Sequence, residues 1–181
     1  MTPARLKFID ESACHLGLTR LYGWAKSGQP CVCGVPGNTG ERQSVVGLFS
    51  VLGMEAHAVE PGSLTGGTFC AFLETHVVPR LAPGDWLVVD NARCHLVKKV
   101  KELVEGAGAV LVYLPAYSPD FSPIELAWRK VKAHLRAAGA RTREALHGAI
   151  AEAVKRVTVE EAKAFFAHCG YSAKEAQAQQ H

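Results

Sequence analysis

The chain has 181 residues, of which 48% are hydrophobic and 20% charged, and its formal net charge is +3. This length fits one domain and is enough to bury a core. A charge this small does not by itself indicate a nucleic-acid-binding protein. No apolar run approaches the roughly 18 residues of a membrane helix, and the first ten residues lack the apolar core of a signal peptide. We therefore expect a cytoplasmic protein.

The cysteines do not predict a metal site. Only Cys31 and Cys33 lie close together in the sequence. A C-x-C pair without a second Cys/His pair at finger-like spacing is a poor zinc signature. We expect reduced thiols that mostly behave as small buried apolar residues.

Turn-rich segments and short apolar segments alternate in the first half of the chain. Alternating or apolar patterns predict strands at 4–10, 20–30 and 42–53, and a further short strand followed by a loop within 55–67. Residues 68–81 have helical periodicity. These segments predict an antiparallel group of strands and one helix.

The second half of the chain predicts alternating strands and helices. Buried strands are expected at 85–90 and 109–115, with a lysine-rich helix closed by glycine, 95–108, between them. A proline-rich loop leads to a helix at about 123–136, and two more helices are expected at about 142–156 and 158–168. We expect an α/β domain over 1–170, with parallel later strands, and a polar tail over 171–181.

Two of these predicted strands end in an acid, Asp10 and Asp90, and a third acid, Glu125, lies near the start of a later helix. If the two strands are neighbours, their carboxylates lie a few ångströms apart and repel each other unless a cation neutralises them. Oxygen ligands of this kind suit Mg²⁺ or Mn²⁺, and a pair of such ions can activate water and stabilise the leaving oxygen in phosphodiester cleavage.

Each acid also has a simpler interpretation. Asp10 and Asp90, taken singly, could be solvated strand ends. Ser122, Pro123 and Glu125 fit a capping box, with Ser at the cap and Glu at the third helical position, and the local sequence favours this role for Glu125. Glu125 could also form an exposed pair with Arg129, four residues later.

Other polar residues near these acids could contact phosphates. His95 could orient a phosphate or a water, or make a hydrogen bond at the start of its helix. The segment 129–143 contains several basic residues and no acid. The candidates for DNA binding are His95, Lys98, Arg129, Lys130, Lys132 and Arg136.

The sequence contains the motif "VVDNARCH", with Asp90 and His95, and the motif "VYLPAYSPDFSPIELAWRKVK", with Glu125. Both motifs resemble the catalytic core of DDE transposases of the mariner superfamily, in the bacterial insertion-sequence branch. The 34 residues between Asp90 and Glu125 match the spacing of that family. The segment "FIDESACHLG" resembles the family's first-acid segment, so Asp10 would be the first acid of the triad.

This resemblance implies a ribonuclease H-like fold with a mixed five-stranded sheet, and DNA cleavage at transposon ends followed by strand transfer. It implies that Asp10 bridges two Mg²⁺ or Mn²⁺ ions while Asp90 and Glu125 each hold one, which replaces the capping interpretation of Glu125. It also implies a homodimer on paired DNA ends, acting at the bacterial nucleoid.

The sequence departs from the family pattern in two ways. Ser122 stands where the family commonly has Asn, and the first acid strand follows Met1 almost directly, without the family's helix-turn-helix region. We therefore expect a catalytic domain alone: a truncated element, the second frame of a split gene or an excised fragment. A separate helix-turn-helix polypeptide could then recognise the DNA ends. Two alternatives remain open: an inactive DNA-binding remnant, and a ribonuclease H-type nuclease acting on RNA–DNA hybrids.

Overall fold

A five-stranded mixed sheet forms the centre of the protein in a computed structural model that describes residues 2–171. Its strands lie in the order β3-β2-β1-β4-β5. They are β1 (Leu6–His15), β2 (Arg42–Ser50), β3 (Gly53–Pro61), β4 (Trp86–Val89) and β5 (Val110–Tyr113). Strands β1, β2 and β3 are antiparallel, whereas β4 is parallel to both β1 and β5. The predicted mixed five-stranded sheet is confirmed.

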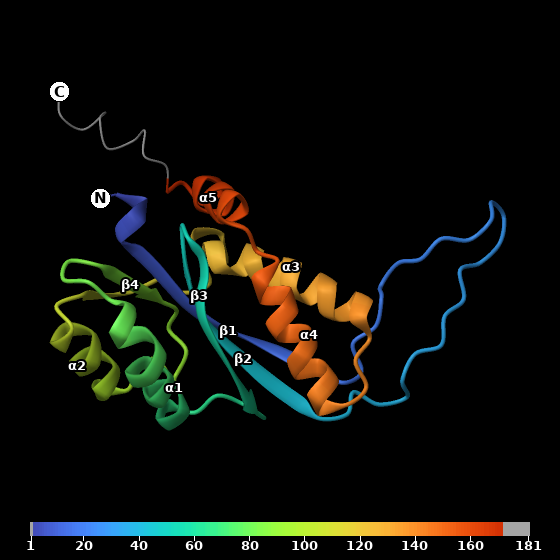
Figure 1. Cartoon of the computed structure of the whole chain (residues 1–181), viewed down its shortest axis with the longest axis horizontal. Helices are drawn as coiled ribbons and strands as arrows, with labels where there is room; N and C mark the ends of the chain where they lie inside the picture. Colours follow the sequence, from blue (N-terminus) through green and yellow to red (C-terminus); the bar gives the residue numbers. More distant parts are fainter. Residues whose placement is uncertain (1, 172–181) are drawn as a thin grey trace.

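Helices cover both faces of this sheet (Figure 1). One side carries α1 (Gly66–Phe72) and α2 (Lys98–Gly106), and the other carries α3 (Pro123–Ala138), α4 (Arg143–Lys155) and α5 (Val159–His168). Short helical turns lie at Pro3–Arg5, Leu73–Val77, Val78–Arg80 and Pro119–Phe121. None of the helices within 2–171 has the length and apolarity needed to cross a bilayer.

The alternation of β1 side chains divides the interior into two cores. Phe8 packs in the core beneath α3, α4 and α5, and the next residue, Ile9, packs in the core beneath α1 and α2. Successive strand residues point to opposite faces of a sheet. The same rule places the side chain of Asp10 on the α3 face and that of Glu11 on the α2 face.

A glycine in β2 lets α3 approach the sheet closely. Gly47 lies opposite Asp10 in the β1–β2 ladder. A Cβ atom at Gly47 would lie 3.0 Å from the Trp128 ring and 2.7 Å from the Met54 sulfur. Because β2 has no side chain at this point, the indole of α3 can pack directly over β2, opposite Asp10 in the ladder.

The structure differs from the sequence prediction in one strand. Residues 20–30 form no strand and belong to a segment between β1 and β2 that extends away from the body (Figure 1). Its aromatic side chains are exposed, with Tyr22 at 90% and Trp24 at 100%. The pattern was strand-like, but strand formation depends on a neighbouring strand and an apolar surface to cover, and this segment has neither.

The remaining elements match their predictions with small shifts of boundary. The helix predicted at 68–81 is instead a short α1 followed by a π-helical turn and a 3₁₀ turn. Of the predicted tail, only Tyr171 is described. It packs against Phe8 and Phe166 and donates a hydrogen bond to the Phe121 carbonyl at 2.8 Å, so it belongs to the core. The other tail residues lie outside the described part of the chain.

Candidate active site

The first two acids lie side by side on neighbouring strands: Asp10 lies in the middle of β1, which continues to His15 rather than ending at residue 10 as predicted, and Asp90 directly follows β4. These strands pair in parallel, with Leu6 opposite Trp86 and Phe8 opposite Val88. The same register, continued for two residues, places Asp10 opposite Asp90. The two acid-bearing strands are therefore neighbours, which is the condition that the sequence analysis set for a shared cation site, and the paired strands position the two carboxyl groups.

The third acid reaches this edge from the first turn of α3. The buried stripe of α3, which includes Ile124, Trp128 and Val131, packs against the sheet and fixes the helix there. Ser122 is the N-cap residue, but its side chain makes no cap hydrogen bond. The capping interpretation of Glu125 is therefore wrong in this structure: only its backbone N–H bonds to Ser122, at the carbonyl oxygen 3.1 Å away.

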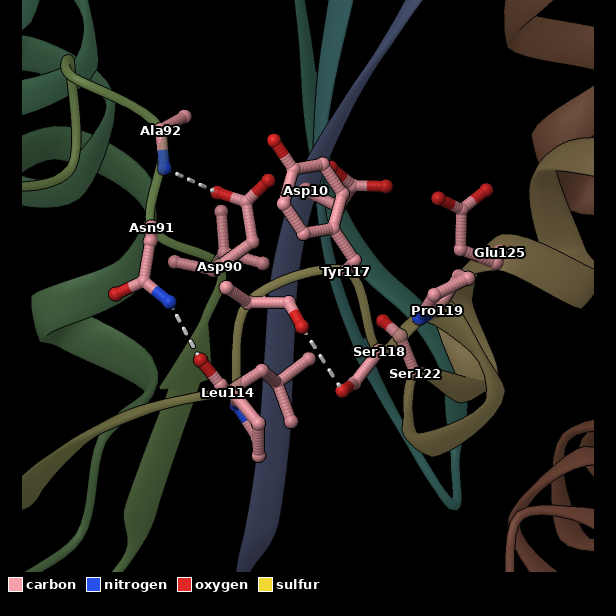
Figure 2. A pocket seen from close by; sticks show the side chains of 13 residues that line it. Asp10, Asp90, Asn91, Ala92, Leu114, Tyr117, Ser118, Pro119, Ser122 and Glu125 are labelled. Atoms are coloured by element: carbon pink, nitrogen blue, oxygen red, sulfur yellow. Dashed lines mark hydrogen bonds between the residues drawn. The ribbon is translucent and has the colours of Figure 1, made fainter.

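All three acids line one pocket of about 440 Å³ (Figure 2). Asp10 comes from β1, Asp90 from the end of β4 and Glu125 from α3, and the loop after β5 forms the remaining wall. In Figure 2 the carboxyl groups of Asp10 and Glu125 face each other across the pocket. The structure thus gathers three carboxyl groups from distant parts of the sequence.

Electrostatics distinguish the two aspartates. Burial, together with the nearby Glu125, Glu11 and Asp90 carboxylates, raises the pKa of Asp10 to about 7. The hydrogen bond from His95 lowers the pKa of Asp90 instead, assisted by the Ala92 backbone N–H. An oxygen-rich pocket in which negative charges raise the pKa of Asp10 is a suitable site for a hard divalent cation, since such an ion relieves the repulsion.

His95 occupies an interior position between two carboxylates. Its side chain is 0% exposed, its Nδ1 donates to Asp90 Oδ1 at 2.6 Å, and its Nε2 lies 3.2 Å from Glu11 Oε2. Both carboxylates raise the pKa of His95, to about 9, against the effect of burial. A direct contact between this buried ring and DNA, as predicted from the sequence, does not fit the structure.

Glu11, Cys94 and His95 also form a compact group with mixed donors. One ligand atom from each lies within 4.8 Å of the other two. Sulfur, nitrogen and oxygen donors together suit softer metals than the all-oxygen pocket on the opposite face. Burial and the nearby Glu11 carboxylate together raise the pKa of the Cys94 thiol to about 11, so the thiolate is disfavoured when no metal is bound.

The loop after β5 closes one side of the pocket. Asn91 donates from its side-chain amide to the Leu114 carbonyl at 2.6 Å, which ties the start of this loop to the end of β4 (Figure 2). Further along the loop, Tyr117 has a positive φ of 57° and a fully exposed side chain. An aromatic residue seldom adopts this conformation, and such strained residues concentrate at functional sites.

The basic residues predicted to bind DNA differ in the exposure of their side chains and in the partners that these side chains already have. Lys130 binds the Glu161 carboxylate at 2.6 Å and also donates to the Arg156 carbonyl, so it holds α5 against α3. Lys98 is 92% exposed and lies 3.3 Å from Glu102. Arg129 is exposed and lines a smaller pocket together with Glu125. Lys132 and Arg136 are partly buried on the same helix.

Sequence reasoning missed three residues at this site. Glu11 was not among the candidates, although strand alternation could have placed it on the face opposite Asp10. Asn91 and Tyr117 were noted only as parts of motifs. No local signal in the sequence indicates that the Asn91 amide bonds a carbonyl 23 residues away or that the Tyr117 φ is positive.

Comparisons with solved structures identify the fold. The mariner Mos1 paired-end complex with Mg matches with a TM-score of 0.69 and 16% identity, over 94% of this chain and 55% of that chain. The Mos1 strand transfer complex matches with a TM-score of 0.69 and 18% identity, over 93% and 51%. The Mos1 catalytic domain with raltegravir and Mg matches over 92% and 77%, with a TM-score of 0.65 and 15% identity.

The chain thus spans about half the length of the transposase chains in those DNA complexes. Its fold is the ribonuclease H-like fold of the Mos1 catalytic domain. The family model of the DDE superfamily endonucleases matches residues 5–147, and the chain belongs to this family. No curated protein matches the sequence.

Proposed function

We propose that the protein is a transposase catalytic domain, extending over 1–170, that cleaves DNA at transposon ends and transfers the freed 3′-hydroxyl to a target. The observation that carries this proposal is the convergence of Asp10, Asp90 and Glu125 in one pocket. Its family and its structural likeness to Mos1 support the same conclusion.

Asp10, Asp90 and Glu125 would bind two Mg²⁺ or Mn²⁺ ions, with Asp10 shared between them. When bound, such ions supply Lewis acidity, activate the attacking water or hydroxyl and stabilise the leaving oxygen of a phosphodiester. Asp10 would lose its proton when such ions bind, because the same carboxylates that raise its pKa also attract cations. Asn91 holds the loop that forms the pocket wall, and Arg129 lies beside Glu125 where it can contact a phosphate.

The partners follow from the same proposal. DNA is the substrate, at the bacterial nucleoid in the cytoplasm, and a helix-turn-helix polypeptide recognises the ends. A homodimer on paired ends is supported by the segment 16–41: its base is held by Arg141, which donates to the Leu16 and Leu18 carbonyls at 2.9 Å, while Trp24 is fully exposed. An exposed aromatic side chain on a firmly anchored segment suits a second protein surface.

The test is nicking of supercoiled DNA in millimolar Mn²⁺ by the wild type and by Asp90→Asn. We expect Mn²⁺-dependent nicking that the substitution reduces by at least about a hundredfold, because the amide cannot replace an anionic ligand. Calorimetric titration with Mn²⁺ should show binding to the wild type that Asp10→Ala abolishes.

Equal nicking by wild type and Asp90→Asn would mean that this pocket is not the active site. No binding of Mn²⁺ would instead favour an inactive DNA-binding remnant. Parallel digestion of an RNA–DNA hybrid and duplex DNA separates a ribonuclease H-type enzyme, which would prefer the hybrid, from the proposed DNA-cleaving enzyme.

A further inference from the structure

The buried ring of His95 links Asp90 to the opposite face of the sheet. Asp10 and Asp90 lie at the α3 face, whereas His95 packs in the interior on the α1–α2 side, with its ring 4.3 Å from the Phe69 ring. The Tyr113 hydroxyl donates to the His95 carbonyl at 3.2 Å and helps fix the backbone at this residue. The imidazole therefore has a fixed position when it meets the Asp90 carboxylate.

The contact with Asp90 is short and directional. Nδ1 of His95 lies 2.6 Å from Oδ1 of Asp90, and the Ala92 backbone N–H donates to the same oxygen at 2.9 Å. Two donors on Oδ1 fix the rotation of the carboxyl group. Oδ2 has no such partner among the described residues, so it remains available toward the pocket.

Glu11 contacts the other nitrogen of the ring. Its Oε2 lies 3.2 Å from His95 Nε2, an ion-pair distance, although the two atoms are not aligned for a hydrogen bond. Glu11 follows Asp10 directly in β1 and points to the opposite face. Two neighbouring residues of β1 thus influence Asp90 in different ways. Asp10 lies in the same pocket as Asp90, whereas Glu11 contacts the imidazole that donates a hydrogen bond to Asp90.

We infer that His95 is a positioning residue for Asp90 and that Glu11 anchors its ring, so that the chain Glu11–His95–Asp90 sets the orientation of one carboxylate of the acidic pocket. This inference rests on the proposed function only in assigning Asp90 to metal binding. Residues that hold ligands by hydrogen bonds generally change metal affinity or activity by 10- to 100-fold when they are substituted.

Two amide substitutions separate the two contacts of the ring. His95→Asn places an N–H donor near the position of Nδ1, where it can still bond Asp90. His95→Gln places its donor near Nε2, where it can reach Glu11 but not Asp90. We expect His95→Asn to keep Mn²⁺ affinity and nicking within about threefold of the wild type, and His95→Gln to lose about tenfold or more in both.

Glu11 and Cys94 provide further variants at less buried positions. Glu11→Ala leaves the ring without its anchor, and we expect Mn²⁺ affinity to fall by about three- to tenfold. Cys94→Ala removes a neighbouring side chain that does not contact Asp90, and we expect no change. A loss in Cys94→Ala equal to that in His95→Gln would show that Glu11, Cys94 and His95 themselves bind the metal, and would overturn the inference.

A metal-free measurement keeps this test separate from that of the proposed function. Urea unfolding in EDTA is compared for the wild type, His95→Gln, Asp90→Ala and the double variant. We expect the shifts of the two single variants not to add, because both remove the same hydrogen bond. Additive shifts, or equal Mn²⁺ affinities of His95→Asn and His95→Gln, would overturn the inference; absence of Mn²⁺ binding in the wild type would count against the proposed function alone.

Discussion

Asp10 and Asp90 lie at equivalent positions on neighbouring strands, yet their surroundings affect their pKa in opposite directions. Asp10 is partly buried and has carboxylates as its nearest charged neighbours. Asp90 accepts hydrogen bonds from His95 and from a backbone N–H. At the scale of single residues, the metal-free pocket therefore disfavours the charged form of Asp10 and stabilises the charged form of Asp90.

This difference predicts how stability depends on pH in the absence of metal. The folded pKa of Asp10, about 7, lies above its ordinary value of 3.8. Between these values the folded state keeps a proton that the unfolded state has lost, so this contribution to stability is full below about pH 4 and is lost as the pH rises through 7. The shift corresponds to about 4 kcal/mol before solvent screening, and we expect about 1–2 kcal/mol after it.

Asp10→Asn should therefore stabilise the metal-free protein at pH 8 and have little effect near pH 4. The measurement is urea unfolding in EDTA at the two pH values. Asp90→Asn is the matched control and should destabilise the protein at pH 8, because the lowered pKa of Asp90 marks a carboxylate that the fold stabilises. If both substitutions destabilise equally at pH 8, the proposed repulsion around Asp10 is absent.

At the scale of elements, the distance between α3 and β1 depends on Gly47. A methyl group at this position meets the Trp128 ring and the Met54 sulfur at 2.7–3.0 Å, which forces α3 away from the sheet. We expect Gly47→Ala to cost about 1–3 kcal/mol of unfolding free energy, as overpacking of a core generally does. It should also weaken Mn²⁺ binding, because Glu125 moves with α3.

Gly148→Ala is the control for this prediction. Gly148 lies in α4 with no atom within 4 Å of an added Cβ. Alanine there should stabilise the helix by about 0.4–1 kcal/mol and leave Mn²⁺ binding unchanged. Unfolding curves and calorimetry measure both effects, and unchanged Mn²⁺ binding in Gly47→Ala would show that the position of α3 does not control the site.

The elements that the sequence predicted well are those whose pattern reflects burial. The strands that contain Val45–Phe49 and Leu87–Val89 are buried on both sides, and their continuous apolar runs are typical of such strands. Residues 20–30 mix aromatic and apolar residues with polar ones and have no surface to cover, so their aromatic side chains remain exposed. Glu125 shows the converse: its local sequence fits a cap, and only the packing of α3 against distant strands directs its side chain into the pocket.

At the scale of the whole molecule, the two faces of the sheet carry different groups of polar residues. The α3 face carries the acidic pocket and the exposed arginine beside it, and the α2 face carries the buried His95 and Glu11. Sequence spacing indicated the three acids because they belong to a family motif. The spacing could not indicate that the His95 side chain is buried, because this burial depends on side chains from β1 and α1 that are remote in the sequence.

DNA binding by the α3 side should depend on a few basic residues. Each phosphate contact contributes about 0.9 to the slope of log affinity against log salt concentration. We expect Arg129→Ala to reduce that slope by about 1, because Arg129 is exposed beside Glu125. Fluorescence anisotropy of a labelled duplex, measured in EDTA over a series of salt concentrations, provides the slope without cleavage.

Lys130→Ala is the matched control, since it removes an equal charge one residue away. Lys130 already binds Glu161 and the Arg156 carbonyl, so its loss should leave the slope unchanged and instead loosen α5. Its unfolding free energy should fall by about 0.5–1 kcal/mol, because the partly exposed Glu161 loses its charged partner. If both variants change the salt slope equally, DNA affinity depends on the net charge of α3 rather than on the position of Arg129. The geometry of the pocket would then make no contribution to DNA binding.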